Sequence, residues 1–137
     1  MKDVVGKKVI RVVAAVVEND GLYLITQRRE SAQLPMLWEF PGGKVETGER
    51  PEETLIRELE EELGIVVKEA CLAPLTFASH TYPDFHLLMP LYVCRRWDGT
   101  VTPREGQGLA WVRPNRLREY PMPPADVPLV AHLTTLL

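Results

Sequence analysis

The acidic residues of this chain are concentrated in one stretch, and that stretch limits what the chain can fold into. Residues 43–69 hold nine glutamates against four lysines and arginines, whereas the whole chain of 137 residues has a net charge of −3. The remainder therefore carries a small positive balance. Like charges at helical spacing repel one another. The stretch must form an element in which clustered carboxylates are tolerated.

This acidic stretch contains residues that favour the start and the end of a helix. Pro51 suits a first helical position, and Glu52 and Glu53 follow in the turn where negative charge is favoured by the helix dipole. Gly64 is a natural stop. The pattern predicts a helix from about Arg50 to Leu63.

Helical periodicity gives the predicted helix an apolar arc that faces a core. Its members are Leu55, Ile56, Leu59 and Leu63. Glu58, Glu61 and Glu62 lie at i, i+3 and i+4, so their carboxylates cluster beside that arc. Glu53 and Glu60 point toward water.

Something should offset the repulsion between these carboxylates, and Arg57 can neutralise only one of them. A hard divalent cation takes oxygen ligands, and Mg²⁺ keeps positions free for water and phosphate oxygens. One interpretation is therefore a metal site for a phosphorylated substrate. The alternative is a solvated acidic helix face.

The spacing of the fixed residues resembles the Nudix box, G-x5-E-x7-R-E-U-x-E-E-x-G-U, where U is aliphatic. Gly43 and Glu49 fill its first positions, and residues 57–65, RELEEELGI, fill the rest. The resemblance implies hydrolysis of a nucleoside diphosphate linked to another group, with Mg²⁺ or Mn²⁺ as cofactor. It also implies an α+β domain, the α/β/α Nudix sandwich with helices on both faces of a mixed sheet.

The chain also resembles the MutT-type nucleoside triphosphatases of this family in four further segments. They are Tyr82–Asp84 with His86, Arg96–Gly99, Arg104–Gln107 and Tyr120–Asp126. In that branch, attack at the β-phosphorus of a nucleoside triphosphate releases a monophosphate and pyrophosphate. The resemblance implies nucleotide-pool sanitisation, a role linked to DNA repair.

The resemblance also implies a set of site residues. The catalytic residues would be Arg57, Glu58, Glu61, Glu62 and Glu105. The metal ligands would be the four glutamates of this set and the carbonyl of Gly42. The substrate contacts would be Arg28, Glu39, Phe40, Pro41, Gly42, Tyr82, Phe85 and Asp126, with Arg28 near the phosphates.

The identity of the base stays open at Asp126. MutT enzymes that cleanse 8-oxo-dGTP carry an Asn at this place, and an ionised carboxylate only accepts hydrogen bonds. Asp126 could accept from guanine N1–H and N2–H, or from a cytosine amino group. Phe85 stands where an Arg can contact the oxidised base. We expect oxidised dGTP as substrate, with CTP or a modified pyrimidine triphosphate as the alternative.

A non-catalytic base-recognition module, like the Nudix-like domain of adenine glycosylases, is the alternative from another class. Such domains usually lose carboxylates of the box, and all of them are present here. The complete box therefore favours an enzyme.

The rest of the chain reads as strands separated by turn signals. Asn19-Asp20-Gly21 predicts a hairpin between Ile10–Glu18 and Leu22–Gln27. Residues 31–37 are expected to form a loop. The other predicted strands are Ile65–Pro74, Phe77–Thr81, Leu87–Arg95 and Leu109–Val112, and the other predicted helices are Pro114–Glu119 and Asp126–Leu137.

Length and composition indicate the number of domains, the kinds of partner and the cellular compartment to expect. Residues 1–137 are long enough for one domain with one core. A net charge of −3 gives no reason to expect a nucleic-acid polymer or an anionic membrane as partner. Cys71 and Cys94 imply no disulfide framework, which fits a reducing cytoplasm. We expect a cytoplasmic monomer or weak homodimer.

Overall fold

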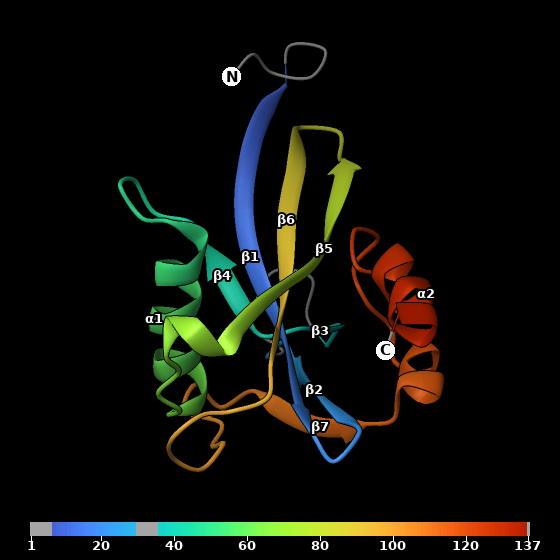
Figure 1. The fold of residues 1–137 in the computed structure, drawn as a ribbon. Helices are drawn as coiled ribbons and strands as arrows, with labels where there is room; N and C mark the ends of the chain where they lie inside the picture. The colour runs from blue at the N-terminus through green and yellow to red at the C-terminus, as the bar shows by residue number, and fades with distance from the viewer. Residues whose placement is uncertain (1–6, 30–35, 137) are drawn as a thin grey trace.

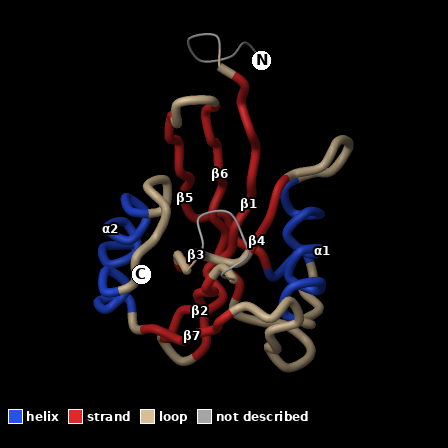
Figure 2. Tube along the Cα trace, turned by 180° about the vertical axis from the view of Figure 1, so that it is seen from behind, coloured by secondary structure: helices blue, strands red, loops and turns tan. Residues whose placement is uncertain are grey.

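A computed structural model describes residues 7–29 and 36–136 as a mixed sheet with a helix on each face (Figure 1). The view from behind shows the same layers (Figure 2). The seven strands of this part of the chain are β1 (Lys8–Asn19), β2 (Leu22–Gln27), β3 (Trp38–Glu39), β4 (Gly42–Lys44), β5 (Leu72–Thr81), β6 (Phe85–Cys94) and β7 (Gly108–Val112). The helices are α1 (Pro51–Leu63) and α2 (Val127–Leu136), with 3₁₀ helices η2 (Glu69–Cys71) and η3 (Pro114–Glu119). The expected α/β/α sandwich is confirmed.

Strand β1 organises the sheet, whose order is β3-β2-β1-β6-β5. It runs parallel to β6, from Lys8 opposite Phe85 to Val17 opposite Cys94. It pairs antiparallel with β4 over Val12–Ala14 and with β2 at the hairpin. Strand β7 pairs with β2. One long strand thus lies between β6 on one edge and the glycines of β4 on the other.

The apolar run in β1 supplies both cores, because successive side chains of a strand point to opposite faces. Val13, Ala15 and Val17 face α1, in a cluster that includes the fully buried Leu55, Leu59 and Leu63. Ala14 and Val16 face the other way, into a cluster that includes the α2 residues Leu129, Val130 and Leu133. The predicted apolar face of α1 is confirmed.

Positive backbone φ angles confirm two predicted turns. Asp20 and Gly21 have φ of 51° and 77°, as expected for the type I′ turn that matches the twist of a hairpin. Gly64 ends α1 with a φ of 71°. A residue with a side chain would be strained there, which is why glycine stops helices so often.

Several predicted boundaries are wrong. Ile65–Pro74 is not one strand, because Val66 meets the chain only at an isolated bridge to Asp98 and η2 follows. The strand begins at Leu72 and continues past an irregularity between Pro74 and Thr76 as β5, so it joins two predicted strands. By contrast, the predicted short helix Pro114–Glu119 is confirmed with these bounds, as a 3₁₀ helix.

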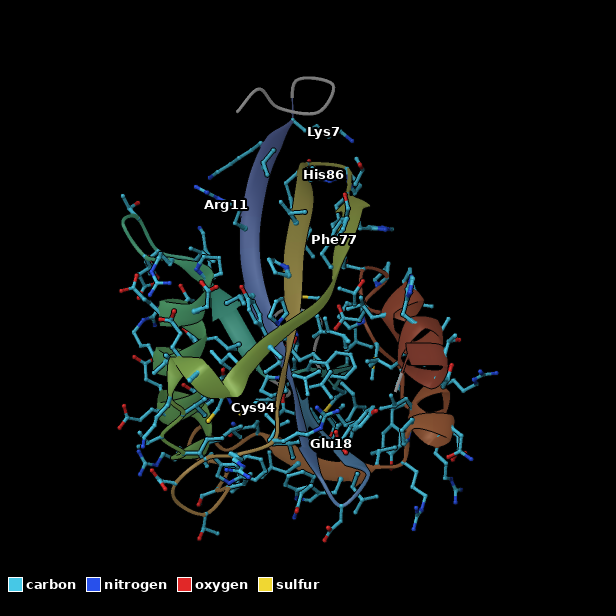
Figure 3. The ribbon with its side chains drawn as sticks, viewed as in Figure 1. Lys7, Arg11, Glu18, Phe77, His86 and Cys94 are labelled. Atoms are coloured by element: carbon cyan, nitrogen blue, oxygen red, sulfur yellow. The ribbon has the colours of Figure 1, made fainter. Side chains whose placement is uncertain are left out.

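The sheet extends past both helices at one end. Lys7, Arg11, Phe77 and His86 lie at that end, whereas Glu18 and Cys94 lie toward the other (Figure 3). His86 is held there between the hydroxyls of Ser79, at 2.7 Å, and Thr81, at 2.8 Å.

In the described part of the chain no helix has the length and apolarity needed to cross a membrane. Most of the predicted loop at residues 31–37 lies outside the described residues.

Candidate functional site

The acidic face of α1 packs against the glycines of β4. A Cβ added to Gly43 would lie 2.4 Å from the carboxyl carbon of Glu58, so any side chain there would displace this carboxylate. A Cβ on Gly42 would collide with the Val13 carbonyl, which is backbone. The first glycine of the box motif therefore allows the Glu58 carboxylate to lie against β4.

Glu62 is a carboxylate held away from water. Its Oε2 atom is buried and has no hydrogen-bond partner among the described residues. Burial, with the negative charges of Glu58, Glu105 and Glu39, raises its pKa to about 9, and only a backbone hydrogen bond from Gly42 opposes this. Such a group is costly unless a positive charge stands beside it.

Arg57 links three of the carboxylates. Its Nε and Nη2 donate to the two carboxylate oxygens of Glu49, both at 2.9 Å, and its Nη1 donates to Glu58 at 2.9 Å. A weaker contact of 3.5 Å reaches Glu61. The guanidinium hydrogen bonds hold the pKa of Glu49 down at about 2. Arg57 is thus a scaffold for the acidic face.

The predicted acidic residues are not equally placed. Glu58 is mostly covered, and burial raises its pKa despite the Arg57 hydrogen bond. Glu61 leaves 54% of its side chain exposed and points toward solvent. Glu105 comes from the exposed loop before β7, and it lines a cavity of about 210 Å³ with Glu62, Glu39 and Gln107. The charges of Glu58, Glu62 and Glu105 act on one another, and Glu61, which also acts on Glu58, lies at the exposed rim.

A larger cavity of about 560 Å³ lies on the other side of the Arg28–Glu39 pair. It is lined by most of the predicted substrate contacts: Arg28, Glu39, Phe40, Gly42, Tyr82, Phe85 and Asp126. The rings of Tyr82 and Phe85 stack with centroids 4.9 Å apart. The Tyr82 hydroxyl accepts a hydrogen bond of 3.2 Å from the Ala125 N–H, which fixes that ring beside the start of α2.

Three predicted substrate residues differ in what they offer this cavity. Phe40 is buried in the core cluster, and the Pro41 carbonyl accepts from the Ala15 N–H at 2.9 Å, so that oxygen belongs to the sheet. Asp126 is only 5% exposed. Burial and the nearby Glu39 raise its pKa to about 7, although Arg28 acts in the opposite sense.

The Arg28–Glu39 pair separates the two cavities. Arg28 Nε and Nη2 both approach Glu39 Oε2 at 2.7 Å. Arg28 directly follows β2, and Glu39 in β3 pairs with Thr26, two residues before Arg28, so the two side chains meet diagonally across the strand pair. The pair therefore presents a guanidinium whose orientation is fixed before any ligand arrives.

The donor set fits a cation. No three His, Cys, Asp or Glu side chains in residues 7–29 and 36–136 are already gathered as a closed ligand set. The buried, partnerless oxygen of Glu62 and the carboxylates of Glu58 and Glu105 around it nevertheless offer hard oxygen donors to a divalent ion. An ion there would relieve the repulsion that raises the Glu62 pKa.

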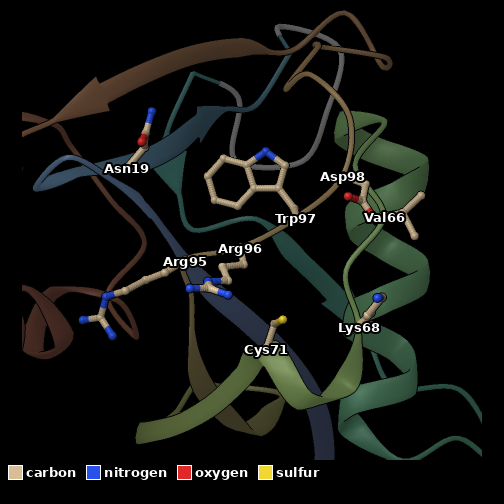
Figure 4. Close-up of a pocket in the computed structure, with 8 residues that line it drawn as sticks. All are labelled: Asn19, Val66, Lys68, Cys71, Arg95, Arg96, Trp97 and Asp98. Carbon is tan, nitrogen blue, oxygen red and sulfur yellow. The ribbon is translucent and has the colours of Figure 1, made fainter.

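A cavity of about 540 Å³ lies apart from these residues, below the ends of β1 and β6 (Figure 4). Its lining includes Lys68, Arg96 and Trp97, and none of the predicted site residues. Arg95 at its edge forms an ion pair of 2.6 Å with Glu18. We assign it no part in the site.

Sequence reasoning gave no role to Glu49, although it is a fixed position of the box. Its two hydrogen bonds to Arg57 and a third of 2.9 Å from the Thr54 hydroxyl make it the anchor of the acidic face. Its spacing from Arg57 could have indicated this role. Glu49 lies eight residues before Arg57 and just before the helix begins, so its side chain can reach Arg57 in the second turn of α1.

The fold is an α/β/α sandwich, with a cluster of carboxylates that is a candidate cation site and, beside it, a cavity lined in part by aromatic side chains. The chain belongs to the Nudix family, since the NUDIX domain model matches residues 12–132. It is 42% identical over 125 residues to a CTP pyrophosphohydrolase of Escherichia coli, covering 90% of each chain. It is 40% identical over 128 residues to an 8-oxo-dGTP diphosphatase of Haemophilus influenzae, covering 93% of each.

A solved structure supports the same assignment. The solution structure of the E. coli ORF135 protein matches with a TM-score of 0.83 and 34% identity, covering 97% of this chain and 94% of that one. Nudix hydrolases generally need a divalent metal ion, in agreement with the donor set around Glu62.

Proposed function

We propose that this protein is a Nudix nucleoside triphosphate pyrophosphohydrolase that releases a nucleoside monophosphate and pyrophosphate. The observation that carries the proposal is the buried, partnerless carboxylate oxygen of Glu62, in an acidic cluster beside an arginine and an aromatic cavity. A cation and a polyphosphate together supply the positive charge and the acceptors that these groups lack. The relatives at 40% and 42% identity support this activity.

The metal would be Mg²⁺, with Mn²⁺ as a substitute, held by Glu58, Glu61, Glu62, Glu105 and the carbonyl of Gly42. The geometry of β4 supports the last ligand. Ala15 donates to Pro41, and hydrogen-bonded pairs alternate along an antiparallel ladder, so the Gly42 N–H and C=O point away from β1. When bound, the ion would lower the pKa of a water molecule and stabilise negative charge on phosphate oxygens.

The protein's own residues would orient and bind the substrate. Arg57 would hold Glu58 in place through the Glu49 anchor, and Arg28 would contact phosphate oxygens with an orientation set by Glu39. Charge-assisted hydrogen bonds of this kind are short and directional. Tyr82 and Phe85 would stack on the base, which tolerates different bases.

Asp126 would read the edge of the base, and the favoured substrate is oxidised dGTP. With a pKa near 7, the carboxyl carries a proton in a large share of molecules at neutral pH. A protonated carboxyl both donates and accepts, as the amide of Asn does. It could therefore donate to guanine O6 while accepting from N1–H, whereas an ionised carboxylate could only accept.

CTP or a modified pyrimidine triphosphate is the second candidate, supported by the 42% identity to a CTP pyrophosphohydrolase. The ionised form of Asp126 could accept from a cytosine amino group. Both candidates use the same metal site, so they differ only at the base.

The experiment is a steady-state comparison of 8-oxo-dGTP, dGTP, dCTP and 5-substituted dCTP with Mg²⁺, following pyrophosphate release. A higher kcat/KM for 8-oxo-dGTP than for the pyrimidines supports the first candidate, and the reverse order supports the second. No pyrophosphate from any nucleotide would refute the enzyme and favour a base-recognition module. The variant E62Q serves as the matched control for contaminating phosphatases.

We further propose that residues 1–137 act as one hydrolase domain, a cytoplasmic monomer or weak homodimer that sanitises the nucleotide pool. The family model covering residues 12–132 supports the single domain. The free thiols of Cys71 and Cys94 fit a reducing compartment.

A further inference from the structure

The loop before β7 closes over the end of α1. The last carbonyls of a helix have no donors within the helix. Here the Thr102 N–H donates to the Leu63 carbonyl at 2.9 Å, and the Arg104 N–H donates to the Glu62 carbonyl at 3.0 Å. The loop that carries Glu105 is therefore attached to the same helix turn that carries Glu62.

One side chain joins these two residues directly. Gln107 Nε2 donates to the backbone carbonyl of Glu62 at 3.0 Å, and its Oε1 accepts from the backbone N–H of Glu105 at 2.9 Å. Gly106, with a φ of 72°, turns the chain so that Gln107 reaches back to Glu105. A side-chain amide carries both a donor and an acceptor, and Gln107 uses one of each here.

The link matters because, among the hydrogen bonds of the described loop residues, it is the one that Glu105 makes itself. Glu105 is exposed on a loop, yet its charge acts on both Glu62 and Glu58. A mobile carboxylate would lose conformational entropy on binding a metal ion, whereas a fixed one has already lost it. Gln107 lines the same cavity as Glu62 and Glu105 without bringing a charge.

We propose that Gln107 is a positioning residue that sets the spacing between Glu105 and Glu62 for metal binding. The inference rests on the proposed function, which assigns both glutamates to the metal site. Gln107 itself touches neither metal nor substrate in this proposal. Its effect passes through the two backbone hydrogen bonds.

The decisive variant is Q107E, with Mn²⁺ binding to nucleotide-free protein measured by electron paramagnetic resonance. An ionised Glu can still accept from the Glu105 N–H, but it cannot donate to the Glu62 carbonyl. The added negative charge alone would tighten cation binding, since opposite charges attract. Loss of an outer-shell partner typically weakens metal binding by about 10-fold to 100-fold, so we expect weaker binding despite the added charge.

A second variant tests the link without any metal. Q107L removes both hydrogen bonds, and we expect the Glu105 amide to exchange with solvent at least about 10-fold faster, since protection follows local opening. T102A is the matched control in the same loop, because it removes only the hydroxyl contact of 2.8 Å to the Thr100 carbonyl. T102A should leave Mn²⁺ affinity and Glu105 exchange unchanged.

Steady-state kinetics separate this proposal from the proposed function. The positioning role is supported if folded Q107E binds Mn²⁺ more weakly than the wild type. Its kcat at saturating nucleotide should also fall when Mg²⁺ is limiting and recover at high Mg²⁺. Unchanged or tighter Mn²⁺ binding, or unchanged Glu105 exchange in Q107L, overturns it even if the wild type hydrolyses nucleotides. A wild type that binds Mn²⁺ without hydrolysing any nucleotide refutes the proposed function and leaves the positioning result standing.

Discussion

Replacing Asp126 with Asn is expected to remove a pH dependence from the stability of the fold. Asp126 is 5% exposed, and burial with the charge of Glu39 raises its pKa from 3.8 to about 7 against the opposing charge of Arg28. The folded state therefore holds this proton more tightly than the unfolded state does. Asn is neutral at every pH and has nearly the same shape.

The sign follows from proton linkage. Because the folded pKa is raised, the stabilisation from the protonated carboxyl is complete below the unfolded pKa near 4 and is lost as pH rises to about 7. The pKa of Asp126 rises by about three, and each pKa unit corresponds to about 1.4 kcal/mol of stability, so the full loss is of the order of 4 kcal/mol. An Asn side chain does not titrate, so the D126N variant does not lose this stability.

Urea unfolding at pH 5, 6, 7 and 8 measures the effect. The free energy of unfolding of D126N minus that of the wild type should rise with pH, by about 3 kcal/mol between pH 5 and pH 8, because part of the full loss of about 4 kcal/mol already occurs below pH 5. Taking the difference cancels the other titrating groups, Glu62 included. The variant D84N makes the same change at an exposed position. A D126N difference that stays flat with pH would refute the assigned environment of Asp126.

Four further predictions concern the acidic face. E62Q should lower turnover by orders of magnitude while its melting temperature stays at or above that of the wild type, since Gln relieves a buried repulsion; unaltered turnover would remove Glu62 from the site. R57K should lower kcat about 10-fold to 100-fold, because Lys cannot hold Glu49 and Glu58 together. Arg57 lowers the pKa of Glu49 to about 2, so the stability that this ion pair contributes should be lost as the pH falls from 4.5 toward 2. Acid unfolding should show a smaller loss of stability over this range in R57K than in the wild type. Chelation should abolish hydrolysis without changing the circular dichroism spectrum, and Mg²⁺ should restore activity and raise the melting temperature.

Local patterns predicted the carboxylate helix well. Pro51 and Gly64 marked its ends, and the spacing of Leu55, Leu59 and Leu63 marked its buried face. The helix is amphipathic and flanked by its own start and stop residues, so its position needs little tertiary information. The hairpin at Asp20 and Gly21 was predictable for the same reason.

Tertiary contacts decided what the sequence left undetermined. The apolar residues Ile65 and Val67 alternate as strand residues do and therefore suggested a strand. Within the described residues, this backbone forms an isolated bridge between Val66 and Asp98 and no extended ladder. Glu61 and Glu62 differ in burial. Strand β4 and the loop that carries Glu105 cover Glu62, and they leave Glu61 exposed to water. The roles of Glu49 and Gln107 depend on side chains reaching across the fold.

The parallel pairing of β1 with β6 has a consequence for how the protein is made. Residues 12–17 leave the ribosome early, whereas their partner strand at residues 85–94 is synthesised more than sixty residues later. At 5 to 20 residues per second, this delay is roughly 3 to 15 seconds. During that time an apolar strand stands without its parallel neighbour, so the nascent chain is a natural client for chaperones that shield such segments.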